Sequence, residues 1–136
     1  DITYIHNDGG AWGMLGGYTW LLLSVTIVVM LVCLALLLKY GVKDKLMFWA
    51  IILVLSGGVG NMIDRIFRGG NVIDFLHFEF WPTFPVFNIA DCAVVVGACL
   101  LIFYFLKGLV DEQKQKRISI QQAASENEQS QKNEED

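Results

Sequence analysis

The chain has 136 residues, of which 54% are hydrophobic, and its mean hydropathy is +0.48. These values exceed what the core of a soluble domain of this size requires, so they exclude an ordinary water-soluble globule and favour a membrane protein. The formal net charge of −4 says little about partners, because seven of the fourteen acidic residues lie in residues 111–136. No basic patch with interleaved aromatic residues is present, so nucleic-acid binding is not expected.

The chain opens on a short segment with the pattern of a strand. Residues 1–6 alternate polar and apolar side chains, and residues 7–10 (NDGG) are typical of a turn. Asp1 is not an initiator methionine, and the segment lacks the basic start and apolar core of a signal peptide. We therefore expect the sequence to begin within a longer protein.

Three apolar segments follow, each long enough to cross a membrane. Residues 18–38 and 46–63 carry no charge, and residues 84–106 carry only Asp91. About 20 helical residues, at about 1.5 Å each, cross a hydrocarbon layer of about 30 Å. The sequence predicts an all-α integral membrane domain at residues 1–110, with spans at about 18–38, 46–63 and 86–106.

Basic residues near the span ends predict the orientation. Positive charge favours the cytoplasmic side, and one side carries seven Lys and Arg residues against two on the other. The seven are Lys39, Lys43, Lys45, Lys107, Lys114, Lys116 and Arg117, and the two are Arg65 and Arg68. We therefore expect the link after the first span and the C-terminal tail to be cytoplasmic, and residues 65–84 to lie outside.

The second span ends in a face of small and polar residues. Gly57, Asn61 and Arg65 recur every four residues, as do Ser56, Gly60 and Asp64. Small residues allow a neighbouring helix to approach closely, so we interpret the glycines chiefly as a helix contact. Arg65 either takes part in an ion pair at the interface or orients a phosphate or backbone carbonyl.

The segment at 65–84 is rich in aromatic residues, which suit the lipid headgroup layer, so we expect it to lie along the membrane surface. Within it, Asp74 is a lone acid in a short apolar stretch. Asp91 lies inside the third apolar segment, where a carboxylate is costly and therefore indicates function. Asn88 precedes Asp91 by three residues and should share its helix face, after Pro82 and Pro85 break the backbone.

If Asp74 and Asp91 meet, mutual repulsion keeps a proton on one of them. The charged carboxylate can then take a proton from an attacking water, while the neutral one donates a hydrogen bond to the developing oxyanion. The alternative is that each acid is a hydrated residue at the membrane boundary, or the partner of Arg65 or Arg68.

The remaining polar features predict less chemistry. Residues 111–136 are rich in Gln, Glu, Ser and Asn, so we expect a disordered tail, with a short amphipathic helix after Leu109 as the alternative. The three cysteines, Cys33, Cys92 and Cys99, lie in apolar segments and resemble buried hydrophobes. His6 and His77 are isolated, so neither a metal site nor another cofactor is expected.

Four motifs in order resemble those of bacterial lipoprotein signal peptidase, the signal peptidase II family. The resemblance covers residues 1 to about 106 and rests on residues 60–65 (GNMIDR), 72–75 (VIDF), 84–91 (FPVFNIAD) and 7–13 (NDGGAWG). It implies a four-span aspartic endopeptidase of the bacterial inner membrane, with Asp74 and Asp91 as its catalytic pair. Its substrates would be prolipoproteins with a lipobox, cut on the amino side of a diacylglyceryl-modified cysteine.

The resemblance also implies roles for other residues. Asn7, Gly9, Asn61, Arg65 and Asn88 match positions around the catalytic pair and the lipobox, and Asp64 matches a corner outside the pair. The segment before the first span would form a small extracytoplasmic sheet, and residues 67–84 a loop and surface helix over the substrate. The implied protein contacts membrane lipids, and we expect a monomer.

Some positions depart from the family pattern. Gly10, Trp12, Gly13 and Cys92 replace Ala, Phe, Ser and Ser or Thr, which are conservative changes, and the family's first span has no counterpart, so we expect truncation at the N-terminus. Two other functions compete: a small transporter or channel component that uses Asp91 as a proton or cation relay, and a non-catalytic scaffold. No inverted repeat supports the first, and the second leaves two acids unexplained.

Overall fold

The computed structural model describes residues 1–7, 18–40 and 43–135, with side chains described up to residue 127. Its elements, in chain order, are β1 (Ile2–Asn7), α1 (Thr19–Tyr40), α2 (Lys45–Phe67), β2 (Val72–Leu76) and α3 (Ile89–Glu135). Contacts divide the chain into a unit at residues 1–101 and a second unit at residues 102–136.

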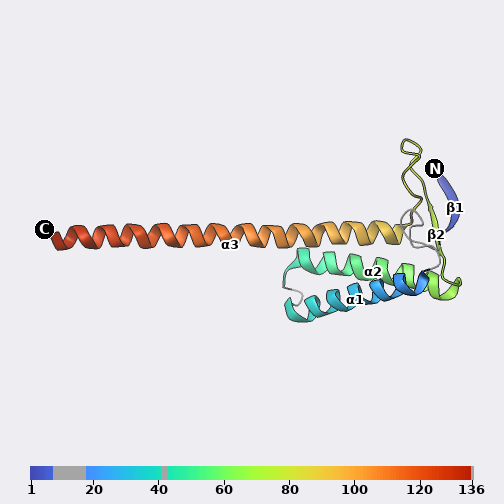
Figure 1. The fold of residues 1–136 in the computed structure, drawn as a ribbon, viewed down its shortest axis with the longest axis horizontal. Coiled ribbons are helices and arrows are strands. Elements are labelled where there is room, and N and C mark those ends of the chain that lie inside the picture. The colour runs from blue at the N-terminus through green and yellow to red at the C-terminus, as the bar shows by residue number, and fades with distance from the viewer. Residues whose placement is uncertain (8–17, 41–42, 136) are drawn as a thin grey trace. The chain divides into compact units, whose positions relative to one another are not determined.

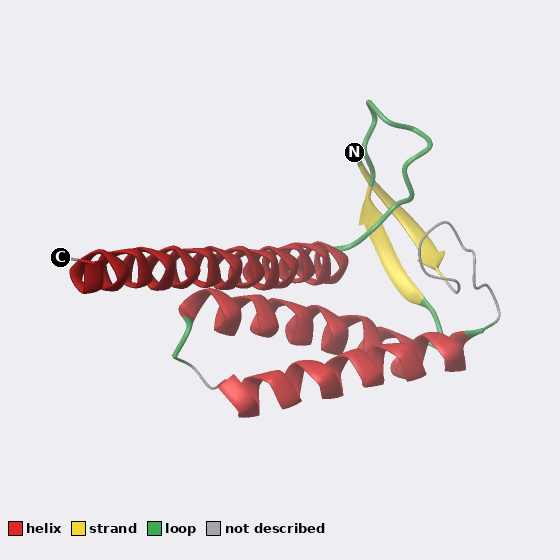
Figure 2. Ribbon diagram, turned by 60° about the vertical axis from the view of Figure 1, so that its left-hand side comes forward, coloured by secondary structure: helices red, strands yellow, loops and turns green. Residues whose placement is uncertain are grey.

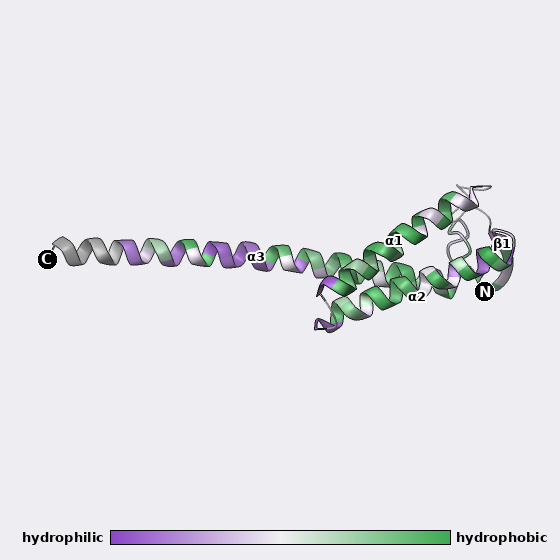
Figure 3. Cartoon of the chain, turned by 90° about the horizontal axis from the view of Figure 1, so that it is seen from below, coloured by the Kyte–Doolittle hydropathy of each residue, from purple (hydrophilic) through white to green (hydrophobic). Residues whose placement is uncertain are grey.

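Three helices of the described residues are long and apolar enough to cross a membrane, as the sequence predicts. They are α1, α2 and, within α3, residues 89–127. Both α1 and α2 are hydrophobic along most of their length, whereas α3 becomes hydrophilic in its second half (Figure 3). The first residue of α1, the last residue of α2 and the first residue of α3 lie at the same end of the helices (Figure 1).

A two-stranded sheet lies beyond that end of the helices (Figures 1 and 2). Strands β1 and β2 are antiparallel, with Ile5 opposite Asp74 and Asn7 opposite Val72. The sheet confirms the predicted N-terminal strand. The sequence analysis did not predict β2, and no described residue between 68 and 88 is helical, so a loop takes the place of the surface helix that the resemblance implies.

Close packing around α2 forms the core. Met47, Ala50, Ile51 and Val54 are almost completely buried. On the side toward α3, a Cβ atom on Gly57 would overlap the backbone oxygen of Ala90 and lie 2.7 Å from a methyl group of Val94. The reciprocal contact is at Gly97 of α3, where a Cβ would lie 2.7 Å from the oxygen of Ala50. The glycine positions therefore allow α2 and α3 to pack backbone to backbone, which confirms the predicted helix contact at Gly57.

The turn from α2 into β2 depends on two glycines with positive φ. Gly69 has φ 62° and Gly70 has φ 98°. The N–H group of Gly70 donates to the oxygen of Arg65 at 2.8 Å and so ends the helix. A Cβ on Gly70 would lie 2.7 Å from Oγ1 of Thr19, at the start of α1, whereas a Cβ on Gly69 would meet nothing within 4 Å.

We predict that Gly70→Ala destabilises the protein more than Gly69→Ala. Both variants place a Cβ in a left-handed conformation, which costs about 1–2 kcal/mol. Only Gly70→Ala adds a clash with Thr19. Thermal unfolding of the two variants in the same detergent measures the difference, and equal midpoints would contradict the prediction.

Helix α3 begins later than predicted and ends later. It starts at Ile89 rather than near residue 86, because Phe87 is still paired with Leu76 as a strand residue. Residues 111–135 are helical, in contrast to the disordered tail expected from composition. Glu, Gln, Lys and Ala dominate this stretch, no Gly or Pro follows Gly108, and Lys116 pairs with Glu112 at 2.7 Å, all of which favour a helix. Side chains from 105 to 127 are exposed.

Candidate functional site

Asp74 lies in the middle of β2 and is only 2% exposed. Both of its carboxylate oxygens accept a hydrogen bond from an amide side chain. Asn7 Nδ2 donates to Oδ2 at 2.7 Å, and Asn88 Nδ2 donates to Oδ1 at 2.8 Å. Because Asn7 ends β1, the pairing of the two strands is what brings this amide to Asp74.

Asp91 lies in the first turn of α3 and closes a reciprocal cap with Asn88. The backbone N–H of Asp91 donates to Asn88 Oδ1 at 3.0 Å, and the backbone N–H of Asn88 donates to Asp91 Oδ2 at 3.0 Å. This is the geometry of a capping box, which satisfies two N–H groups that the helix leaves unpaired. Asn88 is therefore the cap of α3. The sequence analysis had placed it on the face of the helix, and this prediction was wrong.

Two asparagines join the carboxylates into one network. Asn61 Nδ2 donates to Asp91 Oδ1 at 2.7 Å, and Asn61 Oδ1 accepts from Asn88 Nδ2 at 3.0 Å. The orientation of the Asn88 amide follows from these contacts, since its oxygen faces a backbone donor and its nitrogen faces two acceptors. Asn88 thus touches Asp74, Asn61 and the backbone of Asp91 at once.

Burial raises the pKa of Asp74, because the charged form loses its hydration. The hydrogen bonds from Asn7 and Asn88 oppose this change, and the nearby negative charge of Asp91 adds to it. Asp74 and Asp91 are therefore close enough to interact electrostatically. Of two such carboxylates, the more buried one is the better holder of a proton.

Arg65, near the end of α2, is buried at 9% exposure and interacts electrostatically with Asp74. Its Nε atom is buried and has no hydrogen-bond partner among the described residues. Arg68 pairs instead with Asp64, with Nε 3.0 Å from Oδ1, and the other oxygen of Asp64 accepts from the backbone N–H of Ile73 at 3.2 Å. Asp64 therefore holds the corner between α2 and β2, and the Nε of Arg65 lies near the carboxylates without a partner from residues 1–7, 18–40 or 43–135.

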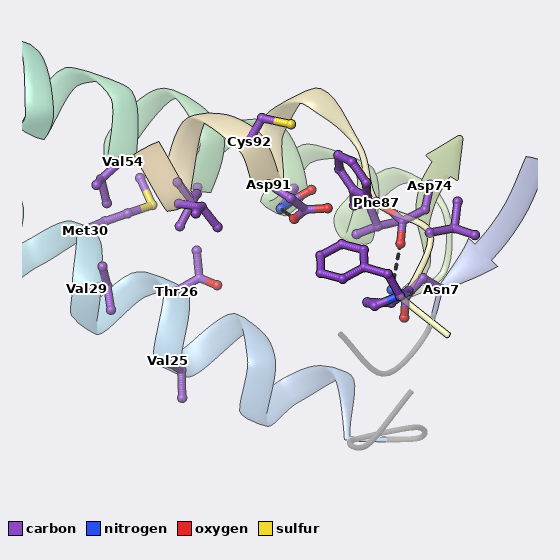
Figure 4. A pocket seen from close by; sticks show the side chains of 18 of the residues that line it. Asn7, Val25, Thr26, Val29, Met30, Val54, Asp74, Phe87, Asp91 and Cys92 are labelled. Carbon is purple, nitrogen blue, oxygen red and sulfur yellow. Dashed lines mark hydrogen bonds between the residues drawn. The ribbon is translucent and has the colours of Figure 1, made fainter. Parts of the chain in front are cut away.

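The carboxylates lie at one end of a cavity of about 620 Å³ (Figure 4). Asn7, Asn61, Asp74 and Asp91 form its polar end. Its other end is apolar and comes from all three helices, through Val25, Val29 and Met30 of α1, Val54 of α2, and Val94 and Val95 of α3. Phe78, Phe84 and Phe87 complete the lining. The cavity can hold a ligand that has one polar and one long apolar part.

The structure brings together most of the residues that the sequence analysis selected. Asn7, Asn61, Asp74, Asn88 and Asp91 share one hydrogen-bond network. Gly9 lies outside the described residues. The sequence analysis assigned the aromatic residues of 65–84 to the headgroup layer and did not predict that phenylalanines line the cavity. No group of metal-binding side chains occurs among the described residues.

The fold and the site together define a multi-pass membrane protein with a pair of neighbouring carboxylates in a partly apolar cavity. The model of the Signal peptidase (SPase) II family matches residues 1–107. The lipoprotein signal peptidase of Bacillus pumilus is 45% identical over 116 residues, which cover 85% of this chain and 72% of that protein. Those of Clostridium acetobutylicum and Halalkalibacterium halodurans are 38% and 40% identical, over 87% and 85% of this chain and 76% and 72% of theirs.

Solved structures agree. Two structures described as a bacterial membrane enzyme, solved by the in meso method at 2.3 Å and 1.9 Å, match with TM-scores of 0.67 and 0.68 at 35% and 36% identity. Each match covers 78% of this chain. This chain spans 65% of the first solved chain, which is just under two thirds of its length, and 68% of the second. The chain belongs to the signal peptidase II family, a family of membrane peptidases.

Proposed function

We propose that this protein is an aspartic endopeptidase that removes signal peptides from prolipoproteins, cutting on the amino side of a diacylglyceryl-modified cysteine. The observation that carries the proposal is that Asn88 contacts both acids: its side-chain amide donates to the Asp74 carboxylate, and its backbone N–H donates to the Asp91 carboxylate. Family membership supports the substrate class, since the relatives are named lipoprotein signal peptidases.

In the proposed mechanism Asp91 is the base and Asp74 the acid. Asp91 lies in the first turn of α3, where one of its oxygens accepts a hydrogen bond from the N–H of Asn88. It takes a proton from water, whose oxygen attacks the scissile carbonyl carbon. Protonated Asp74 donates a hydrogen bond to the carbonyl oxygen. The tetrahedral intermediate then collapses, the C–N bond breaks, and the leaving nitrogen receives the proton that Asp91 holds.

The other polar residues would hold the substrate and the pair. Asn88 and Asn61 fix the two carboxylates, and Asn7 holds Asp74 from β1. The Nε of Arg65, which has no partner in the described part of the chain, is a suitable donor to a substrate carbonyl, because an unsatisfied buried donor costs about 1–3 kcal/mol until it is bonded. The apolar end of the cavity suits acyl chains and the apolar part of a signal peptide.

The proposal includes a location and an orientation. The protein would lie in the bacterial inner membrane as a monomer, with the carboxylates on the extracytoplasmic side and the C-terminal tail in the cytoplasm. The excess of Lys and Arg at the opposite span ends supports this orientation. A signal peptide's cleavage site would arrive on that same extracytoplasmic side.

The test is signal-peptide release from a purified prolipoprotein by the full-length protein in vesicles. We expect cleavage of the diacylglyceryl-modified precursor and none of the unmodified precursor, with the new N-terminus at the lipidated cysteine. A transporter that uses Asp91 as a relay would instead give ion flux without any cleavage. That result would refute the proposed activity.

The assignment of the proton to Asp74 predicts how stability depends on pH. The pKa of Asp74 in the folded protein is raised above its unfolded value of about 3.9. Asp74 therefore contributes fully to the free energy of unfolding below about pH 3.9, and this contribution is lost as the pH rises through the folded-state pKa. In Asp74→Asn no such loss occurs. The melting temperature of the variant, relative to that of the parent, should therefore increase from about pH 4 to about pH 8. A difference that stays constant or decreases would contradict the assignment.

A further inference from the structure

The loop between β2 and α3 exposes two aromatic side chains at its tip. This loop, residues 77–86, is called the aromatic loop below. Phe80 is 82% exposed and Trp81 is 53% exposed. Large aromatic groups that face water in this way usually mark a surface that contacts something else.

The aromatic loop runs sideways from the end of the helices. The loop begins and ends at the Leu76–Phe87 bridge, two residues before α3 starts at Ile89. It extends sideways across the direction of the helix axes, past α3 and away from α1 and α2 (Figures 1 and 2). Since the helices cross the bilayer, a segment that leaves their end sideways runs along the bilayer surface.

Other exposed aromatic residues occur at the same end of the helices. Tyr18 and Trp20, at the start of α1, are 64% and 82% exposed, and Phe67, the last residue of α2, is 82% exposed. Aromatic belts of this kind mark the level of the lipid headgroups. Phe80 and Trp81 continue this belt beyond the helices.

The two tip rings are supported from within the loop. Phe80 packs on Phe78, with ring centroids 5.1 Å apart, and Trp81 packs on Phe84 at the same distance. Two turns fix the backbone, through bonds from the N–H of Trp81 to the oxygen of Phe78 and from the N–H of Phe84 to the oxygen of Trp81. The tip is therefore ordered before it meets a partner, which lowers the entropic cost of binding.

The charge of the aromatic loop limits how it can contact a membrane. The loop contains no Lys or Arg, and Glu79 is its only acid. Attraction to anionic lipid therefore contributes nothing here, and the affinity must come from the rings. We propose that Phe80 and Trp81 insert into the headgroup layer of the bilayer that the helices span, and so anchor the aromatic loop to the membrane surface.

This anchor would also affect the wall of the cavity. Phe78 and Phe84, on which the tip rings pack, both line the cavity that contains Asp74 and Asp91. Lipid contact at the tip therefore fixes the position of two side chains of the cavity wall. The proposal is independent of catalysis, because it concerns the protein without substrate.

Trp81 fluorescence tests the proposal in phosphatidylcholine vesicles without prolipoprotein. The emission of the parent protein minus that of Trp81→Phe gives the Trp81 component, while the conservative change keeps the ring contact with Phe84. We expect brominated phosphatidylcholine to quench this component and aqueous iodide to leave it almost unchanged. Trp49→Phe serves as the control, because Trp49 is 60% exposed inside α2 and should also contact lipid.

Two results would overturn the proposal. In one, iodide quenches the Trp81 component and brominated lipid does not, so that the tip lies in water. In the other, Trp81 becomes shielded from iodide only after prolipoprotein is added and brominated lipid still has no effect. The tip would then bind the substrate polypeptide rather than the membrane.

Discussion

Replacing either Asp74 or Asp91 with Asn should lower signal-peptide release by roughly 10²–10⁴-fold, the usual loss when a positioned acid or base is removed. Asn has nearly the same shape as Asp, but it can neither take a proton from water nor hold one for the carbonyl oxygen. Single-turnover cleavage of a prolipoprotein in vesicles measures the loss. The double variant should cleave about as slowly as either single variant, since the two residues act as a unit.

Asp44→Asn is the matched control for these variants. Asp44 caps the far end of α2, where its Oδ1 accepts from the N–H of Met47 at 3.1 Å. Asn is an equally good cap, so neither stability nor cleavage should change measurably. If Asp74→Asn or Asp91→Asn cleaves as fast as Asp44→Asn, the proposed roles of the two carboxylates are wrong.

Gly57→Ala should destabilise the protein by about 1–3 kcal/mol, the range for overpacking a close contact. Its Cβ would overlap the backbone oxygen of Ala90 and press on Val94, so α2 and α3 must move apart. Ala90 immediately precedes Asp91, and this movement should therefore lower cleavage as well as stability. Thermal unfolding and cleavage are measured on the same preparation.

Gly108→Ala tests whether this effect is due to packing. Gly108 also lies in a helix, but a Cβ there would meet nothing within 4 Å. Replacement of an open helical glycine by Ala stabilises a helix by about 0.8–1 kcal/mol. The two substitutions should thus have opposite signs. If both substitutions changed stability in the same direction, close packing at Gly57 would not be the cause of the Gly57→Ala effect.

The helices could be predicted because lipid imposes a simple rule, that about 20 apolar residues in a row make a span. Helix α2 and its glycines followed from that rule and from four-residue spacing. The start of α3 did not, because Phe87 pairs with Leu76, and this contact is set by the sheet rather than by the helix sequence. The tail was expected to be disordered, with only a short helix after Leu109 as the alternative, because composition indicates whether a segment can form a core. The local preference of Glu, Lys and Ala favours the longer helix instead.

The two acids of the site could be predicted from the free-energy cost of placing a carboxylate in an apolar segment and from the family motifs. The hydrogen bonds that connect them could not be predicted. Strand β2 has only five residues, and its pairing with β1 joins positions 67 residues apart at Asn7 and Asp74. No local pattern specifies such a contact. The role of Asn88 depends on the residue at which α3 begins, since only a residue just before the helix can cap it.

The order of the network along the chain has a consequence for biosynthesis. Asn7 and Asn61 are made before Asp74, and Asn88 and Asp91 come last, at the start of the final span. The side-chain amide of Asn88 donates to the Asp74 carboxylate, and its oxygen accepts from the backbone N–H of Asp91, a contact that needs the first turn of α3. A nascent chain with only α1 and α2 inserted therefore holds Asp74 without this link. We therefore expect the connected site to form only when the third helix is in place.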